Sequence, residues 1–397
     1  MKLLLALLLA LQFAPRPSLS PAETLLESVI LRAINDQPSG GAPVRLIDGT
    51  DKSAGDIFIT CSQCGVATQA MQKLNYLIRE KAMPRPARAI RLLTTADTET
   101  GRRAMAAIFI AELEDRPIQV LRGLWSTAGI ADEVVEIFAR HGGYHVEVRP
   151  FENVGQLRLD HLGVPTTTIV ANPPNSQDSA RAEADPSRSN QHAAFVAAAS
   201  AYFLATLPNS GAEALLSHLT VGAHARLAED GRRAVALMGN QQRASGDVLV
   251  LFGQAIEHEQ RRMRDVERFM PQPSDPMLRS RIADMEQGIT SVWTSMGITS
   301  SPFVPTAERL RGRAGEDRRV PSRASPLKGD AGVVPPAALA KHASVRDLTY
   351  ELTNFVDGKR SISDVRDAVF GEFGSVPLPA VVEYFETLAK AGIVTMR

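Results

Sequence analysis

A strand, a helix and a second strand follow one another between residues 56 and 93. Residues 57–59 (Ile-Phe-Ile) and 90–93 (Ile-Arg-Leu-Leu) are short apolar runs typical of buried strands. Between them apolar residues recur at helical spacing, and Pro84 and Pro86 end the helix before the second run. Because parallel strands joined by a crossover helix form the unit of a layered sheet, the segment predicts an α/β fold: a mostly parallel twisted sheet flanked by helices.

Cysteine and carboxylate side chains follow the two strands. Cys61 and Cys64 come directly after the first strand, and Asp97 and Glu99 come after the second. In open α/β sheets, ligands bind just beyond the carboxyl ends of the strands. These four residues are therefore the candidate site residues.

Four further segments are similar to sequence motifs of a known family. They are residues 83–91 (Met-Pro-Arg-Pro-Ala-Arg-Ala-Ile-Arg), 162–170 (Leu-Gly-Val-Pro-Thr-Thr-Thr-Ile-Val), the Ala-rich 192–205, and 354–361 (Asn-Phe-Val-Asp-Gly-Lys-Arg-Ser). Together they resemble the co-catalytic zinc aminopeptidases of metallopeptidase family twenty-eight, of the leucyl aminopeptidase and aminopeptidase S type. The resemblance is strongest to bacterial members that carry a winged-helix-like tail.

The resemblance implies descent from a di-zinc peptidase. Such a site needs neutral imidazoles, a bridging carboxylate and a general base near the zinc-bound water. Asp97 and Glu99 match the family's acid pair, which supplies the base and one ligand. The first histidine is replaced by Cys61, or has no counterpart if the loop is shifted. The resemblance thus leaves Cys61, Asp97 and Glu99 as candidate metal ligands, and Asp97 and Glu99 as candidate catalytic residues.

The other ligand positions of the family fall on residues that do not bind zinc here. The bridging aspartate is lost among residues 65–68, the third ligand falls in 121–124, and the last near 175–178, with His161 as a neighbouring imidazole. We therefore expect a degenerate site in a protein that binds peptides or a protein partner without catalysis and without a cofactor. The alternative is an active zinc aminopeptidase with rearranged ligands.

Cys61 and Cys64 also support a second alternative, a thiol-disulfide protein. Their Cys-x-x-Cys spacing lies between a strand and a helix, where the helix dipole would favour the thiolate of the first cysteine. In an exported protein the two would be expected to form a disulfide. A structural zinc site would need a second such pair, and the sequence has only these two cysteines.

The pattern beyond residue 100 predicts further elements. Helices are expected over 103–113 and 131–140, and short strands over 118–121 and 144–148. Ser361-Ile-Ser-Asp364 has the form of a capping box with Asp in place of Glu, which predicts a helix start.

The chain begins like an exported protein. Residues 1–14 carry an early lysine and an apolar run of the length of a signal-peptide core, too short to span a bilayer, so no stable membrane span is expected. The 44 basic and 44 acidic residues balance, and the tail carries more acids than bases. This balance argues against phosphate contacts, and no nucleic-acid partner is expected.

Composition changes divide the chain into five parts. They are a signal peptide (1–20), an aminopeptidase-like α/β domain (21–208), a helical segment (209–300), a basic linker (301–344) and a winged-helix-like carboxyl-terminal domain (345–397). The helical segment has the apolar faces of a helical hairpin, through which a homodimer could form.

Overall fold

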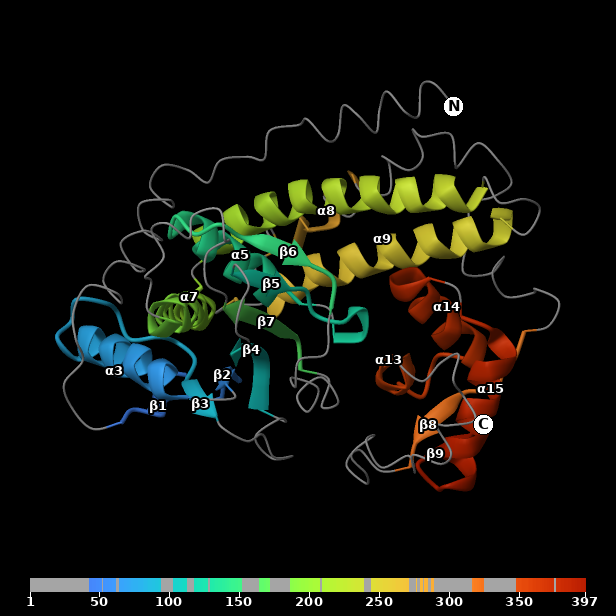
Figure 1. Ribbon diagram of the computed structural model, residues 1–397, viewed down its shortest axis with the longest axis horizontal. Helices are drawn as coiled ribbons and strands as arrows, with labels where there is room; N and C mark the ends of the chain where they lie inside the picture. The colour runs from blue at the N-terminus through green and yellow to red at the C-terminus, as the bar shows by residue number, and fades with distance from the viewer. Residues whose placement is uncertain are drawn as a thin grey trace. The chain divides into compact units, whose positions relative to one another are not determined.

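A computed structural model describes most of the chain between residues 43 and 397 (Figure 1). The described residues are 43–51, 53–61, 64–93, 103–112, 118–127, 129–151, 164–171, 186–207, 209–238, 244–270, 276, 279–280, 282–284, 287–288, 316–324, 348–374 and 376–397. They fall into two compact units. The α/β unit contains the described residues up to 217 together with 264–270, and the helical unit contains 218–263 and the residues from 276 onward.

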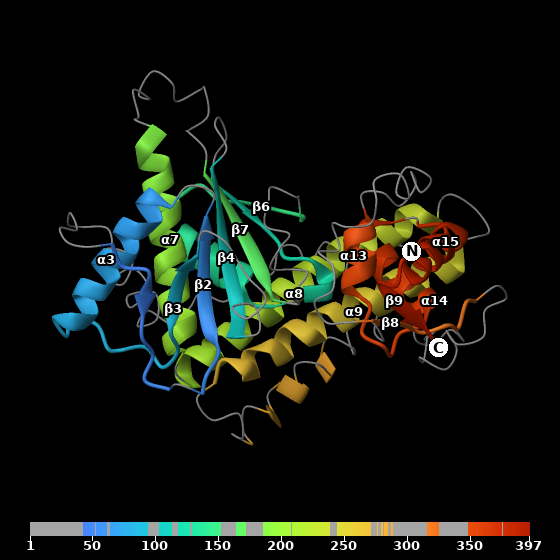
Figure 2. The same ribbon diagram turned by 90° about the horizontal axis from the view of Figure 1, so that it is seen from below.

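The α/β unit is built on a seven-stranded sheet with the order β1-β3-β2-β4-β7-β5-β6 (Figure 2). The β3–β2, β2–β4, β4–β7 and β5–β6 pairs are parallel, and β1–β3 and β7–β5 are antiparallel. The strands are β1 (Leu46–Ile47), β2 (Asp56–Cys61), β3 (Ile90–Leu93), β4 (Ala104–Glu112), β5 (Gln119–Leu121), β6 (Glu147–Arg149) and β7 (Thr166–Ala171). The predicted α/β class and the mostly parallel sheet are therefore confirmed.

Helices pack against this sheet, with α7 (Pro186–Thr206) in contact with β2, β4 and β7 and with both α3 (Gly65–Arg79) and α5 (Ala131–His141). Seven alanines of α7 are at most 1% exposed, and such small side chains let a helix approach its neighbours closely. Phe203 of α7 packs edge to face on Phe138 of α5, with 5.6 Å between ring centroids.

The sequence prediction for residues 103–113 is wrong. A helix was expected there, but Ala104–Glu112 is β4, a strand bonded to β2 on one side and β7 on the other. Residues 106–108 are completely buried. A strand covered on both faces has a continuous apolar run rather than an alternating one. Such a run, here rich in alanine, cannot be told from a buried helix by its periodicity.

The end of α9 (Ala244–Arg268) completes the α/β unit. The guanidinium of Arg88 is buried there and donates from Nη2 to the Arg268 carbonyl at 3.1 Å, which satisfies a carbonyl at the carboxyl end of the helix. The same guanidinium stacks on the Phe269 ring at 5.7 Å. Burial lowers the pKa of Arg88 below its usual value.

The helical unit contains most of α8 (Asn209–Met238) and α9, which lie side by side. Arg226 of α8 forms a two-pronged ion pair with Glu259 of α9, with two N–O distances of 2.7 Å. This pair and the apolar face of α9 hold the two helices in the hairpin that the sequence predicts. Within the described residues, no helix has the length and apolarity needed to cross a bilayer.

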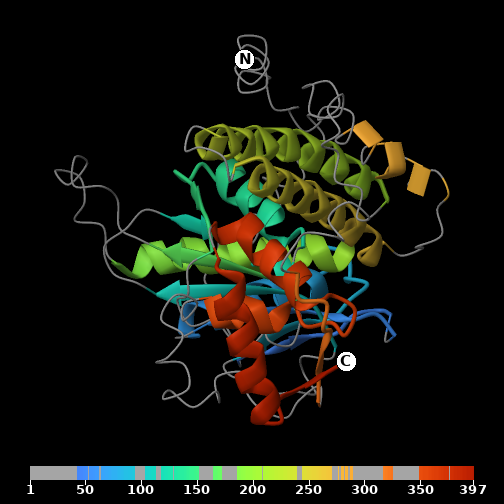
Figure 3. The same ribbon diagram turned by 90° about the vertical axis from the view of Figure 1, so that its right-hand side faces the viewer.

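A small module of three helices and two strands completes the helical unit (Figure 3). Its elements are β8 (Pro321–Arg323), α13 (Thr349–Asn354), α14 (Ile362–Phe373), α15 (Leu378–Lys390) and β9 (Val394–Met396). The predicted capping box is present, since Ser361 accepts from the Asp364 N–H and Asp364 accepts from the Ser361 N–H. β8 pairs with β9, so the expected linker 301–344 contributes a strand.

Candidate functional site

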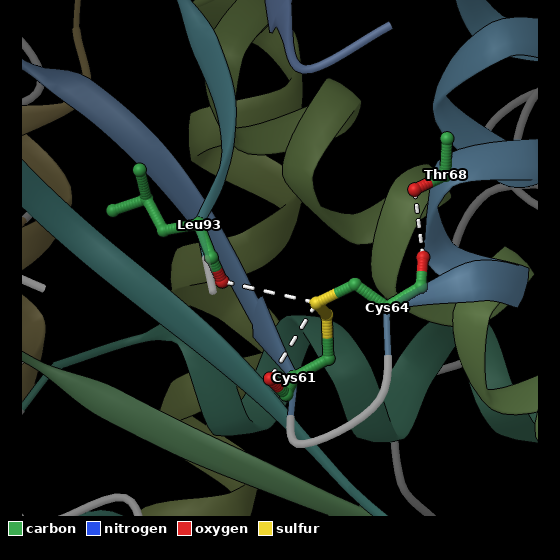
Figure 4. Close-up of a disulfide and its surroundings, with 4 residues drawn as sticks. All are labelled: Cys61, Cys64, Thr68 and Leu93. Atoms are coloured by element: carbon green, nitrogen blue, oxygen red, sulfur yellow. Dashed lines mark hydrogen bonds between the residues drawn. A yellow bond between two sulfur atoms is a disulfide. The ribbon is translucent and has the colours of Figure 1, made fainter. Parts of the chain in front are cut away.

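A disulfide joins Cys61 and Cys64 at the carboxyl end of β2 (Figure 4). Cys61 is the last residue of β2, which lies in the sheet between β3 and β4, and Cys64 precedes the first residue of α3. Their Cα atoms are 5.4 Å apart, within the range usual for a disulfide. The pairing expected for an exported protein is thus formed.

The two cysteines differ in their exposure. Cys61 is 5% exposed, and in the ladder it lies opposite Ile110 of β4. Cys64 is partly exposed. Among the residues that the structure describes, none has an atom within 4 Å of a side chain added at Gly65, so they leave space beside Cys64. Of the two residues, Cys64 is therefore the more exposed.

The helix amino terminus also belongs to Cys64, and not to the first cysteine, to which the sequence analysis assigned it. Cys64 is the residue that caps α3, and its side chain makes no capping hydrogen bond. The first turn of α3 contains no acidic residue that would offset the partial positive charge of the helix end. The backbone N–H and the Oγ1 of Thr68 both donate to the Cys64 carbonyl, at 2.9 and 2.7 Å.

Two backbone carbonyls surround the Cys64 sulfur. It lies 3.4 Å from the Cys61 carbonyl oxygen and 3.9 Å from the Leu93 carbonyl oxygen at the end of β3 (Figure 4). In the disulfide this sulfur has no hydrogen, whereas after reduction its S–H group would have both acceptors within reach. The sequence did not indicate the Leu93 carbonyl, because every residue has a backbone carbonyl. Thr68 could have been found, because it follows Cys64 by four residues, which is the spacing of hydrogen bonds in a helix.

The candidate metal ligands can be placed only in part. Asp97, Glu99 and His161 lie outside the described residues, as do residues 175–178. Among the residues that the structure describes, no group of three or more His, Cys, Asp or Glu side chains is arranged to hold a metal ion. The sulfurs of Cys61 and Cys64 are bonded to each other, so in this form neither is the thiolate that zinc binds.

No family model matches the chain, and no curated protein matches it either. The chemistry of the described residues therefore carries the functional conclusion.

Proposed function

We propose that this chain is an exported protein with a zinc-aminopeptidase-like α/β unit whose zinc site is degenerate, and that it binds a peptide or a protein partner without hydrolysing it. The observation that carries the proposal is the disulfide at the end of β2. By the resemblance, this strand end would hold the first zinc histidine and, shortly after it, the bridging aspartate. Zinc needs a lone pair on a neutral imidazole, a carboxylate or a thiolate, and a sulfur within an S–S bond is none of these.

The disulfide also supports export. Such bonds persist in oxidising compartments and are rare in the reducing cytosol. Cys61 and Cys64 are bonded to each other in the described structure, as the signal-like residues 1–14 would lead one to expect. The three helices and two-stranded sheet of the carboxyl-terminal module similarly support a winged-helix-like domain, which we assign to packing or protein interaction.

Metal content tests the proposal. The full chain, purified with its disulfide intact, should contain zinc far below one equivalent by mass spectrometry and should not hydrolyse leucine amide. Glu99→Ala should change neither result, and Glu80→Ala, which removes an exposed acid at the end of α3, is the matched control. Near-stoichiometric zinc that falls in Glu99→Ala but not in Glu80→Ala would instead establish an active site with rearranged ligands.

Binding is measured on the same preparation. Leucine amide and a tripeptide that begins with leucine are titrated by calorimetry, and binding without turnover is the expected result. Turnover would contradict the proposal. Sedimentation of the full chain tests the further proposal that the α8–α9 hairpin forms a homodimer.

A further inference from the structure

We propose that the Cys61–Cys64 disulfide exchanges with external thiols in the folded protein, and that Cys64 is the sulfur they attack. This activity goes beyond the proposed binding function and does not depend on it. The chemical class of the substrate is a dithiol, which the protein oxidises to a disulfide.

Access selects the attacked sulfur. A thiolate must approach a disulfide sulfur directly, so a buried sulfur is protected from attack. Cys61 is 5% exposed and lies within the ladder between β2 and β4. Cys64 is partly exposed and has open space beside Gly65.

The exchange then proceeds in two balanced steps. The first thiolate of the dithiol forms a bond to the Cys64 sulfur while the Cys61–Cys64 bond breaks, and its electron pair leaves on the Cys61 sulfur, which takes a proton from water. The second thiolate of the dithiol then attacks the dithiol's first sulfur, which is now bonded to Cys64. The Cys64 sulfur leaves as a thiolate. One dithiol is oxidised to a disulfide, and the protein disulfide is reduced to two thiols.

The surroundings of Cys64 favour the second step. Its thiolate is released at the amino terminus of α3, where first-turn N–H groups point outward and no first-turn acid repels it. A better-stabilised thiolate leaves faster. Once protonated, the Cys64 thiol has the carbonyls of Cys61 and Leu93 as acceptors.

The same geometry fixes the roles in the reverse direction. When the reduced protein meets an external disulfide, the exposed Cys64 thiolate attacks and the buried Cys61 thiol resolves the mixed disulfide. The second cysteine of the pair is therefore the attacking one, because Cys64, and not Cys61, stands at the start of the helix.

The wild-type protein provides the first test. The oxidised full chain is incubated with glutathione in native buffer, quenched by alkylation and mapped by peptide mass spectrometry. Glutathione is expected on Cys64, with Cys61 alkylated as the free thiol. Glutathione on Cys61, or a disulfide that glutathione and dithiothreitol open only after urea has unfolded the protein, would overturn the proposal.

Two single variants provide an independent test. Cys61→Ser leaves Cys64 free, and Cys64→Ser leaves Cys61 free. Iodoacetamide should alkylate the Cys61→Ser protein at least tenfold faster at neutral pH, and urea should abolish the difference. Equal rates in two folded variants would contradict the assignment, and the zinc measurement above is unaffected by either result.

Discussion

The carboxylate of Asp265 accepts a hydrogen bond from the backbone N–H of Ile130 at 3.1 Å, although 135 residues separate the two. Ile130 precedes the first residue of α5, whose early N–H groups have no partner within the helix. The other oxygen of Asp265 pairs with Arg268 at 2.7 Å. Both Asp265 and Ile130 are buried, so a side chain from α9 caps a helix of the sheet layer.

Asp265→Ala should lower the free energy of unfolding by about 1–3 kcal/mol, because it leaves a buried N–H without its acceptor. Asp265→Asn keeps an oxygen toward Ile130 and should cost less. Urea unfolding followed by circular dichroism measures both. A wild-type midpoint in Asp265→Ala would show that the bond contributes nothing.

Arg226→Met should destabilise the helical unit by about 3–5 kcal/mol, because Glu259 would lose the two-pronged partner of its buried carboxylate. The double variant Arg226→Met/Glu259→Met should cost less than the sum of the single changes. Thermal unfolding of the four proteins completes the cycle. Additive costs would mean that the two side chains do not stabilise each other.

Ser361→Ala should cost about 1 kcal/mol, because the N–H of Asp364 loses the hydroxyl that caps α14. Asp364→Glu should stay close to wild type, since Ser-x-x-Glu is the commoner form of the capping box. Differential scanning calorimetry of the full chain compares them. The prediction fails if Asp364→Glu loses as much stability as Ser361→Ala.

The pKa of His224 is lowered by burial, which outweighs the opposing attraction of Glu259. Above its ordinary pKa of 6.5 the imidazole is neutral in both the folded and the unfolded chain and has no effect on pH dependence. As the pH falls below that value, the unfolded chain takes up the proton first, so stability falls until the lowered pKa is passed.

His224→Gln should therefore flatten the loss of stability between pH 7 and pH 5. His145→Gln, which changes an exposed histidine, is the control and should keep the wild-type slope. Urea midpoints at several pH values give the slopes. Identical slopes for wild type and His224→Gln would contradict the predicted role.

The elements that could be predicted from the sequence are those whose signals lie within a short stretch of the chain. The strands at 56–61 and 90–93, the helix between them and the cap at Ser361 have spacing or capping signals and lie where predicted. β4 was misassigned because a strand covered on both faces loses its alternation. β8 was missed because its three residues become a strand only by pairing with β9, far along the chain.

The candidate site shows the same division. A disulfide between Cys61 and Cys64 was expected only on the assumption that the chain is exported, and the structure contains this bond. Which of the two cysteines is the more exposed was not predictable, because the spacing alone does not say which one stands at the helix start. The acceptor provided by the Leu93 carbonyl depends on how β3 pairs with β2, which no residue type encodes.

The α/β unit is discontinuous in sequence, and this has a consequence for its synthesis on the ribosome. Its first part ends at residue 217 and its second part begins at residue 264, and the residues between them belong to the helical unit. At about 5–20 residues per second, roughly 2–9 s pass between these points. During that interval the Ile130 N–H lacks its acceptor on Asp265, and the Arg88 guanidinium lacks the Arg268 carbonyl. The α/β unit therefore cannot form these two hydrogen bonds until the end of α9 has been translated.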